Sequence, residues 1–372
     1  MSDPKSKPTH DTRAIAAQFA LLGDYVRAEV YGSGHINDTF CLEMSQGGRP
    51  MRYVLQRINH TIFKDPDGLM SNVERVCAHA QDKLRAAQAA DGSRRALTLV
   101  PTRSGKGWLT DAGGNRWRCY VFVEGATGHD IIRNADQAFQ AAKAFGAFQS
   151  LVADLPGERL VETIPDFHHT PKRLAKFEQV LKADTHGRAK DVTREIDFVL
   201  ARAKEAALVV ESIGRGEIPE RVTHNDTKLN NVLLDNETQE GICVIDLDTV
   251  MPGSALYDFG DLVRTSTSPA AEDDTDLSKV NVQMPMYEAL AKGYLSTAGD
   301  FLTPRERELL PFGGKLMTFE VGLRFLTDWL EGDVYFKVKR PGHNLDRCRN
   351  QFKLVESIEA NLPAMQALAA KS

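Results

Sequence analysis

The chain has 372 residues, 42% of them hydrophobic and 26% charged, a composition that suits a globular protein with one large domain or two lobes. Its 46 Lys and Arg residues against 51 Asp and Glu residues give a formal net charge of -5, which argues against a nucleic-acid partner, whose usual footprint is a basic surface. Five scattered cysteines indicate reduced thiols, the N-terminal stretch lacks the apolar core of a signal peptide, and no apolar run approaches the ~18 residues of a membrane span, so we expect a cytoplasmic protein.

The first third of the chain predicts a small lobe rich in strands. Residues 12–22 have the spacing of a first helix, a strand-turn-strand unit spans 25–40, and another strand follows at 51–58. A long amphipathic helix is predicted at 68–90, and two or three further strands lie within 95–125.

The pattern changes near Glu124 and Gly125, and helices dominate from there to the end of the chain. Two short strands, 230–235 and 241–248, interrupt the helical pattern. The clearest helical segments before the C-terminal third are 135–155, 170–184 and 194–213. The sequence therefore predicts an α+β protein in which a smaller strand-rich lobe precedes a larger helical lobe.

A run of eight mostly polar residues separates two aliphatic runs in the stretch VTHNDTKLNNVLLD. Within it, His224, Asp226 and Asn231 form the pattern H-x-D-x-x-x-x-N, and Lys228 stands two residues after the aspartate. The pattern is typical of phosphoryl transfer in the kinase arrangement. The alternative is a polar turn between two core strands, with the lysine in a salt bridge.

Each residue type in this motif suits one part of that chemistry. Asp226 is placed to accept or orient the proton of an attacking hydroxyl. The amide oxygen of Asn231 and the carboxylate of Asp246, fifteen residues further on, are hard oxygen ligands of the kind that Mg²⁺ prefers. Lys228 would offset the charge that develops on the migrating phosphoryl group.

The turn YGSGHINDTF, between two predicted strands, is the candidate phosphate-covering loop. Gly32 and Gly34, with Ser33 between them, would let the backbone approach phosphates and present N–H groups to them. His35 and Asn37 would point toward phosphate or sugar. An ordinary hairpin turn is the alternative.

The strand at 51–58 lacks the lysine with which protein kinases pair the α- and β-phosphates. Gln56 takes the likeliest matching place and Arg57 follows it; neighbouring strand residues face opposite sides, so both cannot face the nucleotide in regular geometry. Glu74 on the next helix is the candidate partner. Either magnesium neutralises more of the charge of the α- and β-phosphates, or Arg57 reaches these phosphates from a distorted strand. The extended backbone at 122–124, around Val123, would offer its amide and carbonyl groups to an adenine edge.

Three further residues near the motif are predicted to be structural. His224 is expected to orient the loop by hydrogen bonding, because the neighbouring carboxylate already fills the role of base. Asp258 and Asp261 are expected to serve as a helix cap and as a partner for the loop backbone near His224.

Taken together, these motifs resemble the aminoglycoside phosphotransferase-like branch of the protein-kinase-like fold, whose members phosphorylate small molecules. No APE sequence of the protein kinases follows the motif. Within that branch, the stretches THNDTKLNNVLLD, VIDLDTVMPGSALYDFGDLVR and FEVGLRFLTDWLEGDVYF resemble the N-acetylhexosamine 1-kinases, as do GSGHINDTF and YVLQRINHTIFKD.

The resemblance runs from about Tyr31 to about Phe336 and implies a two-lobed protein-kinase-like fold. Residues 1–124 would form the N-terminal lobe, with a nucleotide-covering antiparallel sheet and one long helix. Residues 125–372 would carry the catalytic hairpins and the acceptor-sugar site. The implied reaction transfers the γ-phosphate of ATP, with Mg²⁺, to the anomeric 1-hydroxyl of an N-acetylhexosamine.

The resemblance also implies that Arg324 and Tyr335 contact the sugar, next to Asp226 and Asp246. Alternatively, Arg324 simply pairs with Asp328, four residues later on the same helix. Asp248 would share a strand face with Asp246 if extended geometry persists, and would then reach the metal or the acceptor.

Other readings stay open at this point. The acceptor can be another alcohol, such as choline, homoserine, methylthioribose or an aminoglycoside. A nucleotide-binding protein without turnover is favoured by the missing strand lysine, while the complete trio of Asp226, Asn231 and Asp246 favours turnover. The sequence leaves open the choice between N-acetylglucosamine and N-acetylgalactosamine, between ATP and GTP, and the oligomeric state.

Overall fold

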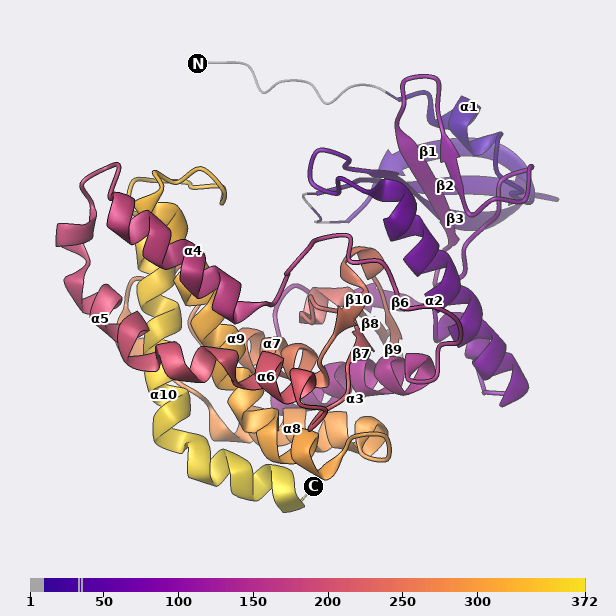
Figure 1. The fold of residues 1–372 in the computed structure, drawn as a ribbon. Helices are drawn as coiled ribbons and strands as arrows, with labels where there is room; N and C mark the ends of the chain where they lie inside the picture. Colours follow the sequence, from indigo (N-terminus) through magenta and orange to yellow (C-terminus); the bar gives the residue numbers. More distant parts are fainter. Residues whose placement is uncertain (1–9, 33, 35, 372) are drawn as a thin grey trace. The chain divides into compact units, whose positions relative to one another are not determined.

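The computed structural model describes residues 10–32, 34 and 36–371 of the chain (Figure 1). It divides into two compact units at the bond between Glu124 and Gly125. The first unit contains most of the long strands, and the second contains most of the helices.

An antiparallel sheet in the order β1-β2-β3-β5-β4 forms the first unit. Its strands are β1 Asp24–Val30, β2 Asp38–Gln46, β3 Arg49–Ile58, β4 Trp108–Thr110 and β5 Arg116–Val121. Alternate residues of the strands, such as Leu42, Leu55 and Trp117, pack with the short helix α1 (Thr12–Ala16) in one buried cluster. The long helix α2 (Pro66–Ala86) and the 3₁₀ turn η1 (Gly92–Arg94) complete the unit.

The first helix is shorter than the predicted 12–22, because Phe19 leaves the helix to form a β-bridge with Thr102.

Helix α9, which runs side by side with α10, organises the second unit and also packs against α7 and α4 (Figure 1). The helices of this unit are α3 Ala135–Val152, α4 Thr170–Ala183, α5 Thr193–Arg202, α6 Leu208–Gly214, α7 Ala255–Ser266, α8 Met284–Ala298, α9 Pro304–Leu330 and α10 His343–Lys371. Short 3₁₀ turns are η2 Ala189–Asp191, η3 Ala203–Ala207, η4 Leu229–Asn231, η5 Leu247–Thr249 and η6 Leu277–Lys279. Among the residues that the structure describes, no helix has the length and apolar character needed to cross a membrane.

The single helix predicted at 194–213 is interrupted by η3. At the break, Arg202 forms an ion pair with Glu359 of α10, and Glu205 pairs with Lys315 of α9. The break therefore lies where this alanine-rich segment makes tertiary ion pairs to α9 and α10.

Two small antiparallel sheets hold the loops that contain Asp226 and Asp246. One has the order β6-β8-β9, with β6 Ala126–Gly128, β8 Val232–Asp235 and β9 Gly241–Val244; the other pairs β7 Arg221–Thr223 with β10 Met251–Gly253. The predicted pairing of the strands at 230–235 and 241–248 is confirmed. Strands β6, β7 and β10 were not predicted, because three residues are too few to show an alternating pattern.

Helices α7 and α9 approach each other backbone to backbone. A Cβ atom at Gly260 of α7 would lie 2.3 Å from the carbonyl oxygen of Gly313 in α9, and one at Gly313 would lie 2.5 Å from the carbonyl oxygen of Leu256. Since no side chain separates them, glycine at both positions sets the distance between the two helices.

We expect the substitution Gly260→Ala to lower the free energy of unfolding by about 1–3 kcal/mol, because an added methyl group in a packed core forces the backbone to move. Gly214→Ala, at the end of α6 where nothing lies within 4 Å, is the matched control and should leave stability unchanged or slightly raised. Urea unfolding curves of both variants check this. Equal midpoints for the two variants would show that the helix contact is adaptable.

Candidate active site

The loop after β7 and the loop after β9 are bonded to each other along their length. The N–H of Ile245 donates to the carbonyl of Asn231 at 2.9 Å. Asn225 Nδ2 donates to the carbonyl of Thr249 at 2.9 Å, and Thr249 Oγ1 donates to the carbonyl of His224 at 2.7 Å. These bonds place the Asp226 loop and the Asp246 loop side by side in the second unit.

His224 is fully buried and bridges the two loops. Its Nδ1 accepts the N–H of Asp226 at 3.3 Å, so its Nε2 carries the proton and donates to the carbonyl of Ile245 at 2.9 Å. The ring packs edge-on against Phe145 and Phe148 of α3, with centroids 5.3 and 5.9 Å away. Because both ring nitrogens are hydrogen-bonded to backbone groups, His224 orients the loop, as predicted.

Asp258, in the first turn of α7, is hydrogen-bonded to the backbone of the same loop. Its carboxylate accepts the backbone N–H groups of His224 and Asn225 at 2.9 and 2.7 Å, and Gln149 Nε2 at 2.6 Å. Burial raises the pKa of this carboxyl group, and the donors around it only partly offset that effect. Asp258 therefore bonds to the loop backbone, as predicted for this pair of aspartates.

Asp226, Lys228 and Asn231 converge at the end of this loop. Lys228 Nζ lies 2.9 Å from Asp226 Oδ1, and Asn231 Nδ2 donates to Asp226 Oδ2 at 3.1 Å and to its carbonyl at 2.8 Å. Burial lowers the pKa of Lys228, but the carboxylates of Asp226 and Asp261 outweigh burial, so the pKa is raised overall. A charged ammonium group thus stands beside the carboxylate.

The orientation of Asn231 suits a hard cation. Because its Nδ2 makes both bonds to Asp226, its Oδ1 would be the atom that binds a cation. Asp246 is exposed and follows Ile245, which is bonded to Asn231. One amide oxygen and one carboxylate suit Mg²⁺, which keeps waters and substrate phosphates as its other ligands. No group of three or more His, Cys, Asp or Glu within the described ranges could hold a metal ion by itself.

The expectation that Asp248 shares a strand face with Asp246 is wrong. Strand β9 ends at Val244, Asp246 has a left-handed φ of 59°, and η5 follows. Since the extended geometry is lost, Asp246 is exposed while Asp248 is only 4% exposed.

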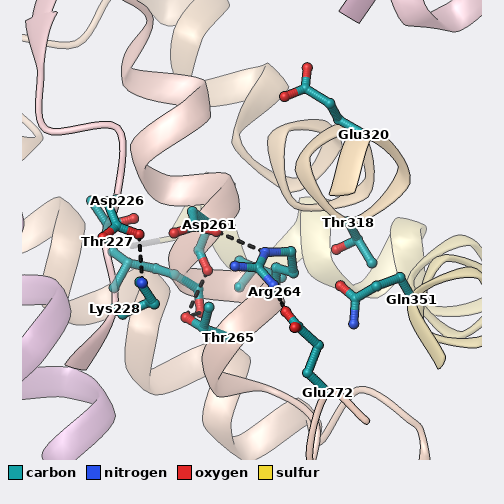
Figure 2. A network of polar contacts seen from close by, with 12 residues as sticks. Asp226, Thr227, Lys228, Asp261, Arg264, Thr265, Glu272, Thr318, Glu320 and Gln351 are labelled. Carbon is teal, nitrogen blue, oxygen red and sulfur yellow. Dashed lines mark hydrogen bonds and ion pairs between the residues drawn. The ribbon is translucent and has the colours of Figure 1, made fainter. Parts of the chain in front are cut away.

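The prediction of a helix cap is wrong for both aspartates, because Ser254 caps α7, and Asp261 pairs with a side chain instead. Its Oδ1 accepts Arg264 Nε at 2.8 Å, and Arg264 Nη1 continues to Glu272 Oε2 at 2.8 Å (Figure 2). Burial raises the pKa of Asp261, but Arg264 and Lys228 together lower it below its ordinary value. Glu272 also accepts Arg347 Nε at 3.0 Å. Alternating charges thus extend from the loop to α10.

Arg324 and Tyr335, predicted to contact the sugar, lie together, with Arg324 Nη2 3.4 Å from Tyr335 Oη. The alternative pairing of Arg324 with Asp328 is wrong. Asp328 is buried and its carboxylate is taken up by the backbone N–H groups of the following loop and by Asn344 Nδ2. The three N–H donors belong to Val334, Tyr335 and Phe336.

In the first unit, Gln56 and Arg57 face opposite sides of β3, whose register with β2 is continuous. The distorted strand that would bring Arg57 to the side of Gln56 is therefore not formed, and Arg57 Nε donates to Asp38 Oδ2 at 2.7 Å. Gln56 accepts Arg118 Nε at 2.9 Å. Arg118 was not considered from the sequence, although it stands opposite Gln56 on β5 and is fully buried.

Other residues considered for the nucleotide lie as follows. Gly32 has a φ of +81°, and no described residue would meet a Cβ atom within 4 Å at Gly32 or Gly34. Asn37 Oδ1 accepts the N–H of Asn59 at 3.0 Å, so it holds the end of β3. Ser33 and His35 lie outside the described residues. Val123 follows β5 and is 9% exposed. Glu74 lies beside Gly107 and makes no hydrogen bond to Gln56 or Arg57.

The architecture is similar to that of solved small-molecule kinases. An aminoglycoside phosphotransferase from Alicyclobacillus acidocaldarius subsp. acidocaldarius DSM 446 is 14% identical with a TM-score of 0.65, covering 100% of this chain and 99% of its own. A microcompartment-associated aminopropanol kinase is 17% identical with a TM-score of 0.57, covering 95% of this chain and 98% of its own. The GDP complex of aminoglycoside 2'-phosphotransferase-IIIa is 13% identical with a TM-score of 0.53, covering 94% and 98%.

The predicted two-lobed, kinase-like α+β fold is thus confirmed. Residues 27–309 match the family model described as "Phosphotransferase enzyme family" (APH). The chain belongs to this phosphotransferase family.

We expect the substitution Asp261→Asn to lower the free energy of unfolding by about 3 kcal/mol, because it leaves the buried guanidinium of Arg264 with one carboxylate instead of two. Glu308→Gln, which removes an exposed ion pair with Arg305, is the matched control and should cost less than about 1 kcal/mol. Chemical denaturation at neutral pH measures both. A cost for Asp261→Asn no larger than that of the control would mean that the buried charges do not depend on this carboxylate.

Proposed function

We propose that this protein transfers the γ-phosphate of ATP to the anomeric 1-hydroxyl of N-acetylglucosamine or N-acetylgalactosamine and forms the sugar 1-phosphate. The observation that carries the proposal is the convergence of Asp226, Lys228 and Asn231 on one loop that is bonded to the loop of Asp246. Membership of the phosphotransferase family supports phosphoryl transfer to a small molecule. The sugar is supported by the motifs shared with the N-acetylhexosamine 1-kinases.

In the proposed reaction, the carboxylate of Asp226 accepts the proton of the 1-hydroxyl as its oxygen attacks the γ-phosphorus in line with the departing ADP. Lys228 donates to the oxygens of the migrating phosphoryl group, where negative charge develops. Asn231 Oδ1 and the carboxylate of Asp246 would hold Mg²⁺. When bound, this ion neutralises charge on the phosphates.

The nucleotide is proposed to contact the first unit. Structural neighbours have been solved with AMP and with GDP, which supports a purine nucleotide as the donor. Among the described residues, none lies within 4 Å of a Cβ atom at Gly32 or Gly34, which would let phosphates approach the backbone there, and Val123 would offer its backbone to the base. Gln56, held by the guanidinium of Arg118, takes the place of the missing lysine.

The acceptor is proposed to lie in the second unit against Arg324 and Tyr335. A sugar bears hydroxyl oxygens that accept from a guanidinium, which has donors only. Choline and aminoglycosides are cationic, so a positive group at this place disfavours them as acceptors.

We expect Asp226→Asn to lower kcat by about 10³-fold while the dissociation constant for ATP stays within about twofold, because the amide cannot accept the hydroxyl proton. An ADP-release assay across a panel of sugars and amino alcohols gives kcat, and calorimetric titration gives nucleotide binding. Asp82→Asn, at an exposed carboxylate on α2, is the control and should retain full activity.

Two results of this experiment would contradict the proposal. Turnover of another alcohol without any response to N-acetylhexosamines would reject the sugar assignment. Nucleotide binding with equal background ADP release from wild type and Asp226→Asn would reject catalysis by this loop.

A further inference from the structure

The peptide bond between Asn225 and Asp226 is held on both edges by histidine side chains. Its N–H group, which belongs to Asp226, donates to Nδ1 of His224 at 3.3 Å. Its carbonyl oxygen, which belongs to Asn225, lies 3.2 Å from Nε2 of His168, in the segment before α4. A carbonyl oxygen can only accept, so Nε2 of His168 carries a proton and donates it. Two rings therefore fix the peptide that leads into the proposed base.

The other ring nitrogen of His168 also faces an acceptor. Nδ1 lies 2.8 Å from Oε1 of Glu320 in α9, and Oε2 of the same carboxyl group accepts Thr170 Oγ1 at 2.6 Å. Glu320 is fully buried, which raises its pKa, but its hydrogen bond to His168 and the positive charges around it outweigh burial, so its pKa is lowered overall. Glu320 is therefore a carboxylate that accepts from Nδ1 of His168.

These two bonds together define the charge of the His168 ring. A neutral imidazole has one N–H donor and one acceptor nitrogen, so it can satisfy only one of two acceptors. Because both nitrogens of His168 donate, the ring carries two protons and a positive charge. His224 differs, since its Nδ1 accepts. The ring of His168 is 9% exposed and packs against Phe167 and Tyr257, with centroids 4.5 and 5.3 Å away.

The charges around His168 balance an imidazolium. The carboxylate of Glu320 in α9 is in direct contact with the ring, as described above. Asp261 in α7 also faces it. Burial raises the pKa of Asp261, and the charge of His168 adds to the charges of Arg264 and Lys228 in lowering it. Two buried carboxylates from two different helices therefore act on the cation.

The carbonyl that His168 binds belongs to a residue with an unusual backbone. Asn225 has a left-handed φ of 63°, which few residues other than glycine adopt. Its N–H donates to Asp258 Oδ1 at 2.7 Å, and its side chain is bonded to Thr223 and to the carbonyl of Thr249. The bond from His168 fixes the remaining polar group of Asn225. Without this bond, the peptide would be free to turn and to displace the next residue.

We propose that His168 is a positioning residue that acts as an imidazolium. Its Nδ1–H is anchored by the carboxylate of Glu320, and its Nε2–H holds the carbonyl of Asn225, so that the carboxylate of Asp226 points at the acceptor hydroxyl. The inference rests on the proposed function, in which Asp226 is the base. It assigns to a charged hydrogen bond the orientation of that base.

Two substitutions separate the two hydrogen bonds. His168→Asn has its amide nitrogen close to the position of Nδ1 and retains the donor to Glu320, whereas His168→Gln has its amide nitrogen close to the position of Nε2 and retains the donor to Asn225. We expect His168→Asn to lower kcat about 10- to 100-fold and to change KM less than about threefold, because a displaced base slows the chemical step. His168→Gln should keep kcat within about threefold of the wild type.

The order of stability should be the opposite. His168→Gln leaves the buried carboxylate of Glu320 without its donor, so its urea midpoint should lie below that of His168→Asn. His169→Asn is the control. The Nδ1 of His169 caps α4 by accepting the N–H of Lys172 at 3.2 Å, and asparagine is a favoured helix cap, so both kcat and the midpoint should be unchanged.

A spectroscopic measurement tests the charge directly. Nitrogen NMR of protein labelled at the histidine rings is recorded at neutral pH, and the His168 signals are those missing from either variant. We expect both ring nitrogens of His168 to carry protons, whereas Nδ1 of His224 does not.

The outcomes separate this inference from the proposed function. A nitrogen of His168 without a proton overturns the imidazolium even if N-acetylhexosamines are phosphorylated. If the less stable variant is also the slower one, stability alone explains the rates and the positioning role is overturned. Turnover of another alcohol, with His168→Asn slower than His168→Gln, rejects the sugar assignment and supports the positioning role. Absence of turnover with every alcohol overturns both.

Discussion

The buried carboxylate of Asp258 is the interaction on which the candidate site depends. A polar loop that passes through a core must find partners for its backbone N–H groups, since each unsatisfied one costs about 1–3 kcal/mol. The carboxylate of Asp258 accepts the N–H groups of His224 and Asn225, and it also accepts a hydrogen bond from Gln149. Because the backbone is fixed at these two residues, the position of Asp226, the next residue, is fixed as well. His224 connects this fixed backbone to the neighbouring loop.

The same helix contact that positions Asp258 also positions the acceptor side. Asp258 and Asp261 are carried by α7, whereas Glu320 and Arg324 are carried by α9. The close approach of α7 and α9 at Gly260 fixes the spacing between these two sets of side chains. A shift of either helix would therefore change the proposed distance from base to acceptor.

The fold class and the hairpin of β8 and β9 could be predicted because their signals are local. The motif around Asp226 and the strand before Asp246 are each contained in about a dozen residues of sequence. The position of Asp248 could not be predicted, because the turn at Asp246 depends on a left-handed backbone that the sequence IDLDT does not demand. Asp328 likewise takes its role from the backbone of the loop that follows α9, and no periodicity reports which carboxylate binds a loop.

The alternating charges that extend from the loop to α10 have a consequence for the proposed reaction. They belong to Lys228, Asp261, Arg264, Glu272 and Arg347. Lys228 stands between two carboxylates, Asp226 and Asp261, and the second is itself held by Arg264. When Asp226 takes up a proton, Lys228 loses one negative neighbour and its ammonium group attracts phosphoryl oxygens more strongly. Arg264 and Lys228 lower the pKa of Asp261, which favours a charged carboxylate beside Lys228. In the proposed reaction, proton acceptance by Asp226 and stabilisation of the migrating group would therefore be coupled through the carboxylate of Asp226.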